Sequence, residues 1–316
     1  MDFTSRFDLP NMEYFSLVNS CNGLVCLSGG EDEEEEESIY VCNPVLGEYI
    51  TIQLPEESSW RCYGSFGLGF SSRSNEFKVL RTFRDENFGL LRNRTHTVKA
   101  EIYTLGTGSW RSIENVPDDI DISFLGFNSF LHGTLHWATI KGYPKFCCKI
   151  ICFNFEEELF GEIPVPPQFE PDFGSGDAHH QLKLGVYDGC LSACCFRGDG
   201  AWEFDIWVMK EYGVKESWVT QFRIDAYEAY CETDFYIEED NITGCYPLIF
   251  LKNGEIMFSF NNQFVVSYNL ERETLRDTGL FHTTGEFDAV GYTPCFVSLE
   301  DVVKGEQITR YSTMLL

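Results

Sequence analysis

The chain has 316 residues, of which 43% are hydrophobic and 16% aromatic, enough to bury the core of a compact domain. Fifty acidic residues stand against 23 basic ones, and the formal net charge of −27 repels phosphate backbones and anionic lipid surfaces. We therefore expect no nucleic acid and no membrane among the partners of this protein.

The cysteine content and the first residues predict a reducing environment. The chain contains 13 cysteines, but it is far larger than the small secreted proteins whose folds depend on disulfides. Residues 1–6 lack a basic segment followed by an apolar one, and no stretch approaches the roughly 18 apolar residues that span a bilayer. We expect a protein of the cytoplasm, the nucleus or both.

Short apolar runs separated by Gly, Asn, Asp or Pro occur from one end of the chain to the other, and such runs are strand signals. No window of helical length keeps an apolar i, i+3, i+4, i+7 pattern, so the class is all-β. The runs form five groups of four. The expected strands are 15–20, 24–28, 39–42 and 49–54; 65–70, 76–83, 100–105 and 109–114; 127–131, 134–140, 149–155 and 159–165; 182–187, 190–196, 202–209 and 217–224; 247–251, 255–260, 264–269 and 275–280.

Turn dipeptides mark the first hairpin of four of these groups, at residues 22–23, 132–133, 188–189 and 253–254. Asn-Gly and Asp-Gly suit tight hairpins because both positions tolerate positive φ. The spacing is close to the roughly 40 to 50 residues of propeller blades, and predicts a propeller-like repeat of four-stranded antiparallel blades. Residues 288–299 supply one further strand or hairpin, so we expect an incomplete sixth blade. A β-sandwich of irregular meanders remains the alternative.

Several short motifs follow one another in a fixed order. They include Ser20-Cys21-Asn22-Gly23-Leu24, Val41-Cys42-Asn43-Pro44, Gly67-Leu68-Gly69-Phe70, Ser109-Trp110-Arg111, Leu135-His136-Trp137 and Ser217-Trp218. This set resembles the F-box-associated, kelch-like domain of plant F-box proteins. The resemblance implies a domain over residues 15–300, with a short N-terminal segment at 1–14 and a C-terminal tail at 301–316.

The resemblance also implies a function, which is to select a protein for ubiquitination within an SCF-type ligase, without catalysis by this domain. In that family an N-terminal F-box binds a Skp-type adaptor and, through it, a cullin. Only 14 residues precede Phe15, and Pro10 interrupts them, so no F-box of roughly 45 residues fits there. We expect this polypeptide to bind adaptor and cullin only if an F-box is supplied, which co-purification would test.

We find no motif for catalysis, metal binding or a cofactor. Gly174-Ser175-Gly176 lies in a loop-like stretch without the strand and helix of a nucleophile elbow. His132 with His136, His179 with His180, and the cysteines near 147–152 and 190–195 lack the spacing of zinc ligands. Structural roles are expected for them. A propeller-fold glycoside hydrolase, or a scaffold or decoy without a ligase role, remains the alternative function.

Long polar connections are the candidate partner-binding loops, because long loops in compact repeat domains are commonly functional. They span residues 31–37, 84–97, 168–181 and 226–246, and Trp60 is the tryptophan most suited to an exposed anchor. Their acidity predicts a basic partner and salt-sensitive binding. The candidate residues are Glu31, Asp32, Glu33, Glu34, Glu35, Glu36, Glu37, Trp60, Arg84, Asn87, Arg92, Arg94, Asp172, Asp177, His179, Tyr227, Tyr230 and Glu238.

Overall fold

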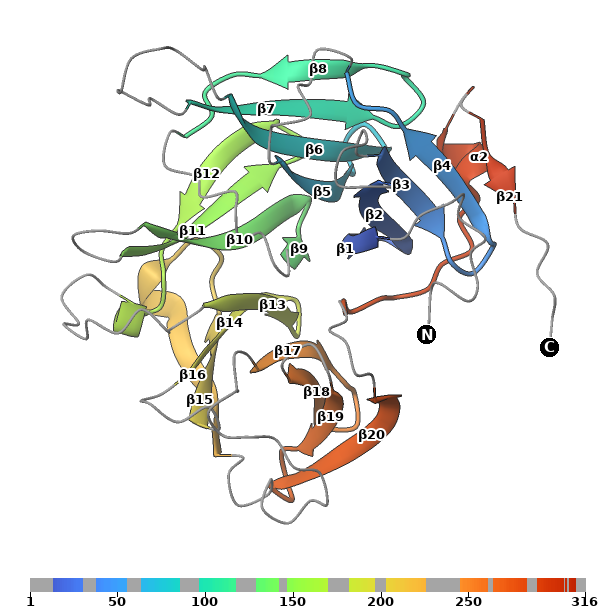
Figure 1. The fold of residues 1–316 in the computed structure, drawn as a ribbon. Helices are drawn as coiled ribbons and strands as arrows, with labels where there is room; N and C mark the ends of the chain where they lie inside the picture. The colour runs from blue at the N-terminus through green and yellow to red at the C-terminus, as the bar shows by residue number, and fades with distance from the viewer. Residues whose placement is uncertain are drawn as a thin grey trace. The chain divides into compact units, whose positions relative to one another are not determined.

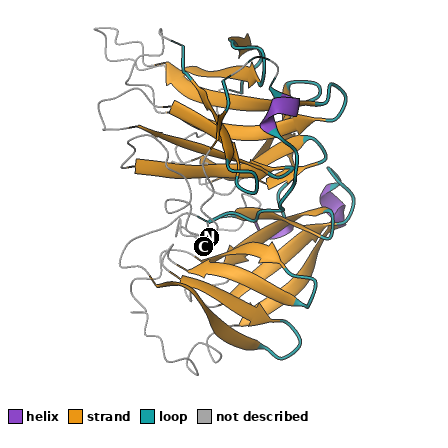
Figure 2. Ribbon diagram, turned by 90° about the vertical axis from the view of Figure 1, so that its right-hand side faces the viewer, coloured by secondary structure: helices purple, strands orange, loops and turns teal. Residues whose placement is uncertain are grey.

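The computed structural model describes residues 14–30, 38–55, 64–85, 97–117, 129–141, 147–169, 182–196, 203–225, 245–260, 264–282, 289–303, 305 and 307–310. Strands dominate this part of the chain (Figure 2). The chain divides into two compact units: unit 1 comprises Met1–Leu135, Cys152–Gly161 and Tyr292–Leu316, and unit 2 comprises His136–Ile151 and Glu162–Gly291. Among the described residues, no helix is long and apolar enough to cross a membrane.

The strands form five antiparallel sheets, each a meander in chain order (Figure 1). The bounds are β1 Tyr14–Cys21, β2 Leu24–Gly30, β3 Ser38–Asn43 and β4 Glu48–Ile52; β5 Gly64–Ser71, β6 Glu76–Asp85, β7 Thr97–Thr104 and β8 Trp110–Ile113; β9 Ser129–Leu131, β10 Thr134–Lys141, β11 Cys147–Asn154 and β12 Leu159–Ile163; β13 Lys183–Tyr187, β14 Cys190–Phe196, β15 Glu203–Met209 and β16 Trp218–Asp225; β17 Cys245–Phe250, β18 Glu255–Phe260, β19 Phe264–Asn269 and β20 Thr274–His282. The expected all-β class and the five groups of four strands are confirmed.

The expected sixth blade is wrong. Residues 289–298 contain no strand, and Leu299–Val302 forms a short helix, α2. The side chain of Ser298 caps this helix by accepting the N–H of Glu300, and acidic residues in a first turn favour a helix N-terminus. Further on, β21 (Thr309–Arg310) adds a fifth strand to the first sheet by pairing with β4. The sandwich alternative is also wrong, because the described strands form five sheets and not two.

The two-residue turns at 22–23, 132–133 and 188–189 have positive φ at both positions, as expected for type I′ hairpins. The expected turn at 253–254 differs. Gly254 has a φ of 82°, whereas Asn253 is not among the residues with positive φ. Leu251 N–H donates to the carbonyl of Glu255 at 2.8 Å, so this turn is longer, with the glycine alone left-handed.

Three blades share a turn between their third and fourth strands that begins with asparagine. The Oδ1 atoms of Asn43, Asn154 and Asn269 each accept the N–H groups of the residues two and three positions later, at 2.9–3.2 Å. The residue four positions after each asparagine has positive φ and donates its N–H back to the asparagine carbonyl. Such side-chain contacts fix the turn locally.

The first sheet of unit 1 is apolar on both faces. Along β2, Leu24 and Cys26 join a buried cluster with residues of β5 and β6, whereas Val25 and Leu27 join another that is covered by Tyr292. Successive strand residues point to opposite faces, so this alternation shows that both faces are buried. Two sheets of unit 2 likewise share one core, in which the Phe204 and Phe258 ring centroids lie 4.9 Å apart.

A buried asparagine joins the first two sheets. A bulge at Val18 shifts the register of β1, and Asn19 is fully buried. Its Nδ2 donates to the carbonyl of Leu68 in β5, and its Oδ1 accepts the Leu68 N–H, both at 2.8 Å. One side chain therefore satisfies both backbone groups of a residue in the neighbouring sheet.

Two tryptophans, one in each unit, make equivalent hydrogen bonds from the fourth strand of one sheet to the backbone that follows the fourth strand of another. Trp110 begins β8 and donates its indole N–H to the carbonyl of Gln53, which directly follows β4. Trp218 begins β16 and donates to Pro164, which directly follows β12; both distances are 2.8 Å. Trp110 packs against the buried cluster of unit 1 and Trp218 is buried in unit 2, so each tryptophan combines packing with a directed hydrogen bond.

The variant Asn19→Ala should destabilise unit 1 by about 2–4 kcal/mol, because it leaves the buried N–H and C=O of Leu68 without their partner. The measurements are the midpoint of urea unfolding and hydrogen exchange at the Leu68 amide. Gln53→Ala, at an exposed amide side chain of the same unit, is the control and should change neither. Unchanged protection of Leu68 in Asn19→Ala would contradict the assignment.

Candidate partner-binding surface

Most of the predicted site residues lie outside the described residues. These are Glu31, Asp32, Glu33, Glu34, Glu35, Glu36, Glu37, Trp60, Asn87, Arg92, Arg94, Asp172, Asp177, His179, Tyr227, Tyr230 and Glu238. Arg84 is described by its backbone, which pairs with Val98 in the β6–β7 ladder. The loop assignment therefore stays a prediction.

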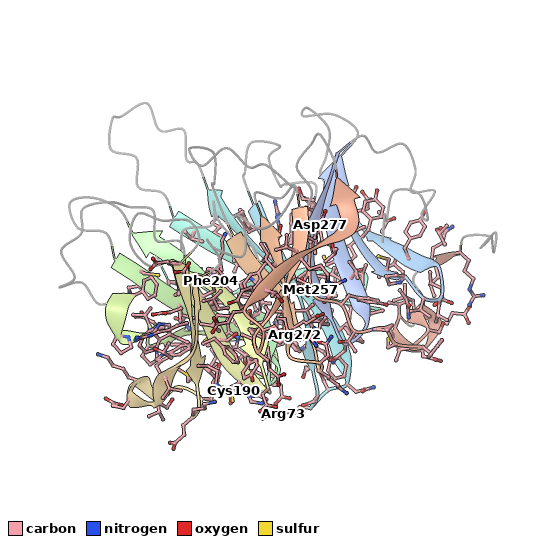
Figure 3. The ribbon with its side chains drawn as sticks, turned by 90° about the horizontal axis from the view of Figure 1, so that it is seen from below. Arg73, Cys190, Phe204, Met257, Arg272 and Asp277 are labelled. Atoms are coloured by element: carbon pink, nitrogen blue, oxygen red, sulfur yellow. The ribbon has the colours of Figure 1, made fainter. Side chains whose placement is uncertain are left out.

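The strand ends that flank these loops lie at the same end of their respective sheets. In a four-stranded meander, the end of the second strand, the start of the third and the end of the fourth lie together, opposite the two hairpin turns. In unit 2, for example, Cys190 follows a tight turn and Phe204 lies near the other end of the same sheet (Figure 3). Each sheet thus has one end of short, ordered turns and one end from which the predicted loops depart.

No group of three or more His, Cys, Asp or Glu in the described part of the chain could hold a metal ion. His132 lies in the β9–β10 turn, whereas His136 is fully buried in β10 and its Nε2 lies 2.6 Å from the Tyr212 hydroxyl. His179 and His180 are outside the described residues. His136 therefore has a hydrogen-bonding role within unit 2.

The described cysteines of the first sheet are buried thiols. Burial raises the pKa of Cys21, Cys26 and Cys42, in the case of Cys42 to about 12, so these thiols stay protonated at neutral pH. Cys42 Sγ donates to the carbonyl of Val25 at 3.5 Å. Cys152 and Cys194 are likewise buried, in agreement with the structural role expected for them.

A segment near the C-terminus, residues 292–303, lies along the first sheet, and we call it the strap. Figure 1 shows its helix α2 beside β4. Asn43, at the end of β3, holds it: Asn43 Nδ2 donates to the carbonyls of Cys295 at 3.2 Å and Val297 at 2.8 Å. The Tyr292 hydroxyl donates to the carbonyl of Gly23 at 3.3 Å. The strap is therefore fixed by hydrogen bonds to the turn end of the sheet.

Glu48, at the start of β4, holds the strap a second time. Its carboxylate accepts hydrogen bonds from the Ser298 hydroxyl, from Leu299 N–H at 2.8 Å and from Arg310 Nε at 3.1 Å. Burial opposes the ionisation of Glu48, but these hydrogen bonds and the charge of Arg310 outweigh it and lower the pKa of the carboxyl below its ordinary value of 4.5. Glu48 is thus an ionised anchor for the strap at neutral pH.

The strap and the β3–β4 turn beside it expose three apolar residues to solvent, Phe296 and Val297 of the strap and Val45 of the turn, and we call them the apolar cluster. Their exposed fractions are 37%, 84% and 41%. Asn43 holds the backbones of Val45 and Val297 close together, because its Oδ1 accepts the N–H of Val45 while its Nδ2 donates to the carbonyl of Val297, which follows Phe296. A large apolar side chain held in water on an ordered backbone is typical of a surface that binds another protein.

Sequence reasoning missed this cluster, because it assigned Phe296 and Val297 to a strand of the sixth blade. The apolar residues Tyr292, Phe296 and Val297 in a short segment give a strand signal that local sequence does not distinguish from a strap. The Asn43-Pro44 motif could have indicated the turn after β3. The contact of Asn43 with the strap could not have been found in the same way, because its partners lie about 250 positions away. Long-range hydrogen bonds of this kind have no local pattern.

A comparison with protein families tests the resemblance that the short motifs indicated. The family model of the F-box associated beta propeller domain matches residues 2–284. The chain belongs to this family. The resemblance that the short motifs indicated is therefore confirmed.

Relatives of this F-box associated domain include two proteins from Arabidopsis thaliana. F-box protein At3g07870 is 32% identical over 89% of this chain and 69% of its own length, and F-box/kelch-repeat protein At3g23880 is 30% identical over 67% of this chain and 53% of its own length. The chain thus spans between about half and about two thirds of these relatives. Polysaccharide lyase Uly1 aligns with a TM-score of 0.47 and 11% identity over 90% of this chain and 82% of its own, which carries no argument.

In this F-box associated domain, the hold of Glu48 on the strap should depend on pH. The folded-state pKa is lowered, so the contribution is complete above about pH 4.5 and is lost as the pH falls through the folded value. Exchange of the Leu299 amide, corrected for its intrinsic rate, should accelerate in that acid range. Glu48→Gln should weaken protection at neutral pH and abolish this pH dependence.

Glu300→Gln is the matched control, since Glu300 pairs with Arg310, whereas the Leu299 amide donates to Glu48. It should leave the pH profile of that amide unchanged. The assignment of Glu48 would be contradicted by an acid-dependent loss of protection that persists in Glu48→Gln.

Proposed function

We propose that this chain is the target-recognition module of an F-box protein and serves as the substrate receptor of an SCF-type ubiquitin ligase, without catalysis of its own. The observation that carries the proposal is the family match over residues 2–284. Relatives that share 32% and 30% identity bear the name F-box protein, which supports the same role. The proposed partners are a protein target and, through an F-box, a Skp-type adaptor and a cullin.

Features of the described residues fit a binding role. Each sheet carries ordered turns at one end, the strap is fixed by Asn43 and Glu48, and an apolar cluster faces solvent. A rigid scaffold with variable surface positions is the usual basis of recognition by repeat proteins. The proposed location is the cytoplasm or the nucleus, a placement that the free thiols of Cys21, Cys26 and Cys42 support.

The test compares two proteins: the full chain, and the same chain joined downstream of the F-box segment of the relative At3g07870. Each is expressed in plant cells with a tagged Skp-type adaptor. The fused protein should co-purify with the adaptor, and the chain alone should not. Proteins recovered with both forms are the candidate targets, and they should be ubiquitinated and depleted only with the fused form.

Each other outcome has a defined meaning. Stable adaptor binding by the chain alone would show that an F-box need not be supplied. Targets that bind both forms and are never ubiquitinated would replace the ligase role by that of a scaffold or decoy. Hydrolysis of a glycoside panel that is lost when one carboxylate is neutralised would overturn the non-catalytic assignment.

A further inference from the structure

Phe296 is the most exposed large apolar side chain among the described residues, at 84%, yet its backbone is held on both sides. Asn43 binds the carbonyls of Cys295 and Val297, and Glu48 binds the next two residues of the strap. The side chain itself contributes little to the fold, since it lies almost wholly in water. The structure thus fixes the position of a ring that it does not use for packing.

Such a ring is suited to bind another protein. Burial of a phenylalanine side chain on binding is favourable, and the hydrogen-bonded backbone that carries it is already ordered, so association costs little conformational entropy there. Val45 and Val297 extend the apolar area beside it. An exposed ring on an ordered backbone would fit an apolar pocket on a partner protein.

The charges around the cluster indicate the rim of that pocket. Glu300 is 59% exposed, Asp301 is also exposed, and Arg310 is paired with both Glu48 and Glu300. Two carboxylates therefore pair with Arg310, and Asp301 adds an exposed carboxylate next to Glu300, in a chain whose formal net charge is −27. Complementary charge at the rim of an interface favours a partner with basic side chains.

We propose that Val45, Phe296 and Val297 form a docking surface for a folded protein whose apolar pocket is rimmed by Lys and Arg side chains. The inference rests on the proposed role in protein recognition and adds a surface other than the predicted loops. Phe296 fills the pocket, the two valines seal its edge, and Glu300 and Asp301 pair with the basic rim.

The experiment starts with the full chain carrying the photo-crosslinker p-benzoylphenylalanine in place of Phe296. After irradiation in plant extract, the crosslinked protein and the attached residues are identified, and that protein is purified. Its affinity is then measured by calorimetry at low and high salt. Four forms of the chain are compared: the parent, Phe296→Ser, Glu300→Lys and Leu159→Ser.

Phe296→Ser should raise the Kd at least about tenfold, as expected for a central aromatic anchor. Glu300→Lys should weaken binding at low salt and much less at high salt, where rim charges are screened. Leu159→Ser is the matched control, because Leu159 is a 51% exposed apolar residue on β12 in the same unit, and it should leave the Kd unchanged. The attachment site on the partner should lie in an apolar pocket beside Lys or Arg.

Several results would overturn the proposal: no crosslink, crosslinks only within the chain or between two copies of it, or a partner bound equally by the parent and Phe296→Ser. A target that tolerates Phe296→Ser but is lost when residues 168–181 are replaced by a short linker would leave the proposed function standing and reject this surface. A partner that meets every test here but is never ubiquitinated would support the surface and reject the ligase role.

Discussion

The first sheet of this protein has two apolar faces, and a four-stranded sheet cannot bury both by itself. In unit 1, alternate residues of β2 enter two different clusters, one shared with β5 and β6 and one covered by Tyr292. A sheet of this kind needs cover on each side, because exposed apolar faces cost free energy in water. The repeat of blades and the strap over the first of them follow from this requirement.

Directed hydrogen bonds supply what apolar burial alone does not, a fixed register between neighbouring sheets. Asn19 satisfies both backbone groups of Leu68, while Trp110 and Trp218 reach carbonyls that directly follow the fourth strand of the preceding sheet. A buried polar group without its partner costs free energy. A shift of one sheet by one residue against its neighbour would therefore lose these hydrogen bonds as well as packing, and so costs more than the loss of packing alone. The same geometry recurs in both units because the blades repeat.

The sequence contains enough local information to predict the strands and the tight turns, because apolar alternation and Asn-Gly or Asp-Gly pairs act over a few residues. A recurring asparagine at 43, 154 and 269 could also have been recognised as the start of one turn type. The strap could not be predicted. Its apolar residues have strand-like spacing, and its path depends on Asn43 and Glu48, far away in the chain. Most residues of the predicted loops lie outside the described residues, so the loops remain a sequence-based prediction.

The backbone at position 296 is held by hydrogen bonds that do not involve the side chain of that residue, so its conformation does not depend on which side chain is present. The backbone there is fixed by Asn43 and Glu48, so natural selection can exchange the residue at 296 without first repairing the fold. A substitution at this position should therefore change the surface with little effect on stability. In the docking surface proposed above, one substitution at 296 would alter partner preference, whereas a substitution of Asn43 or Glu48 would release the backbone that carries it.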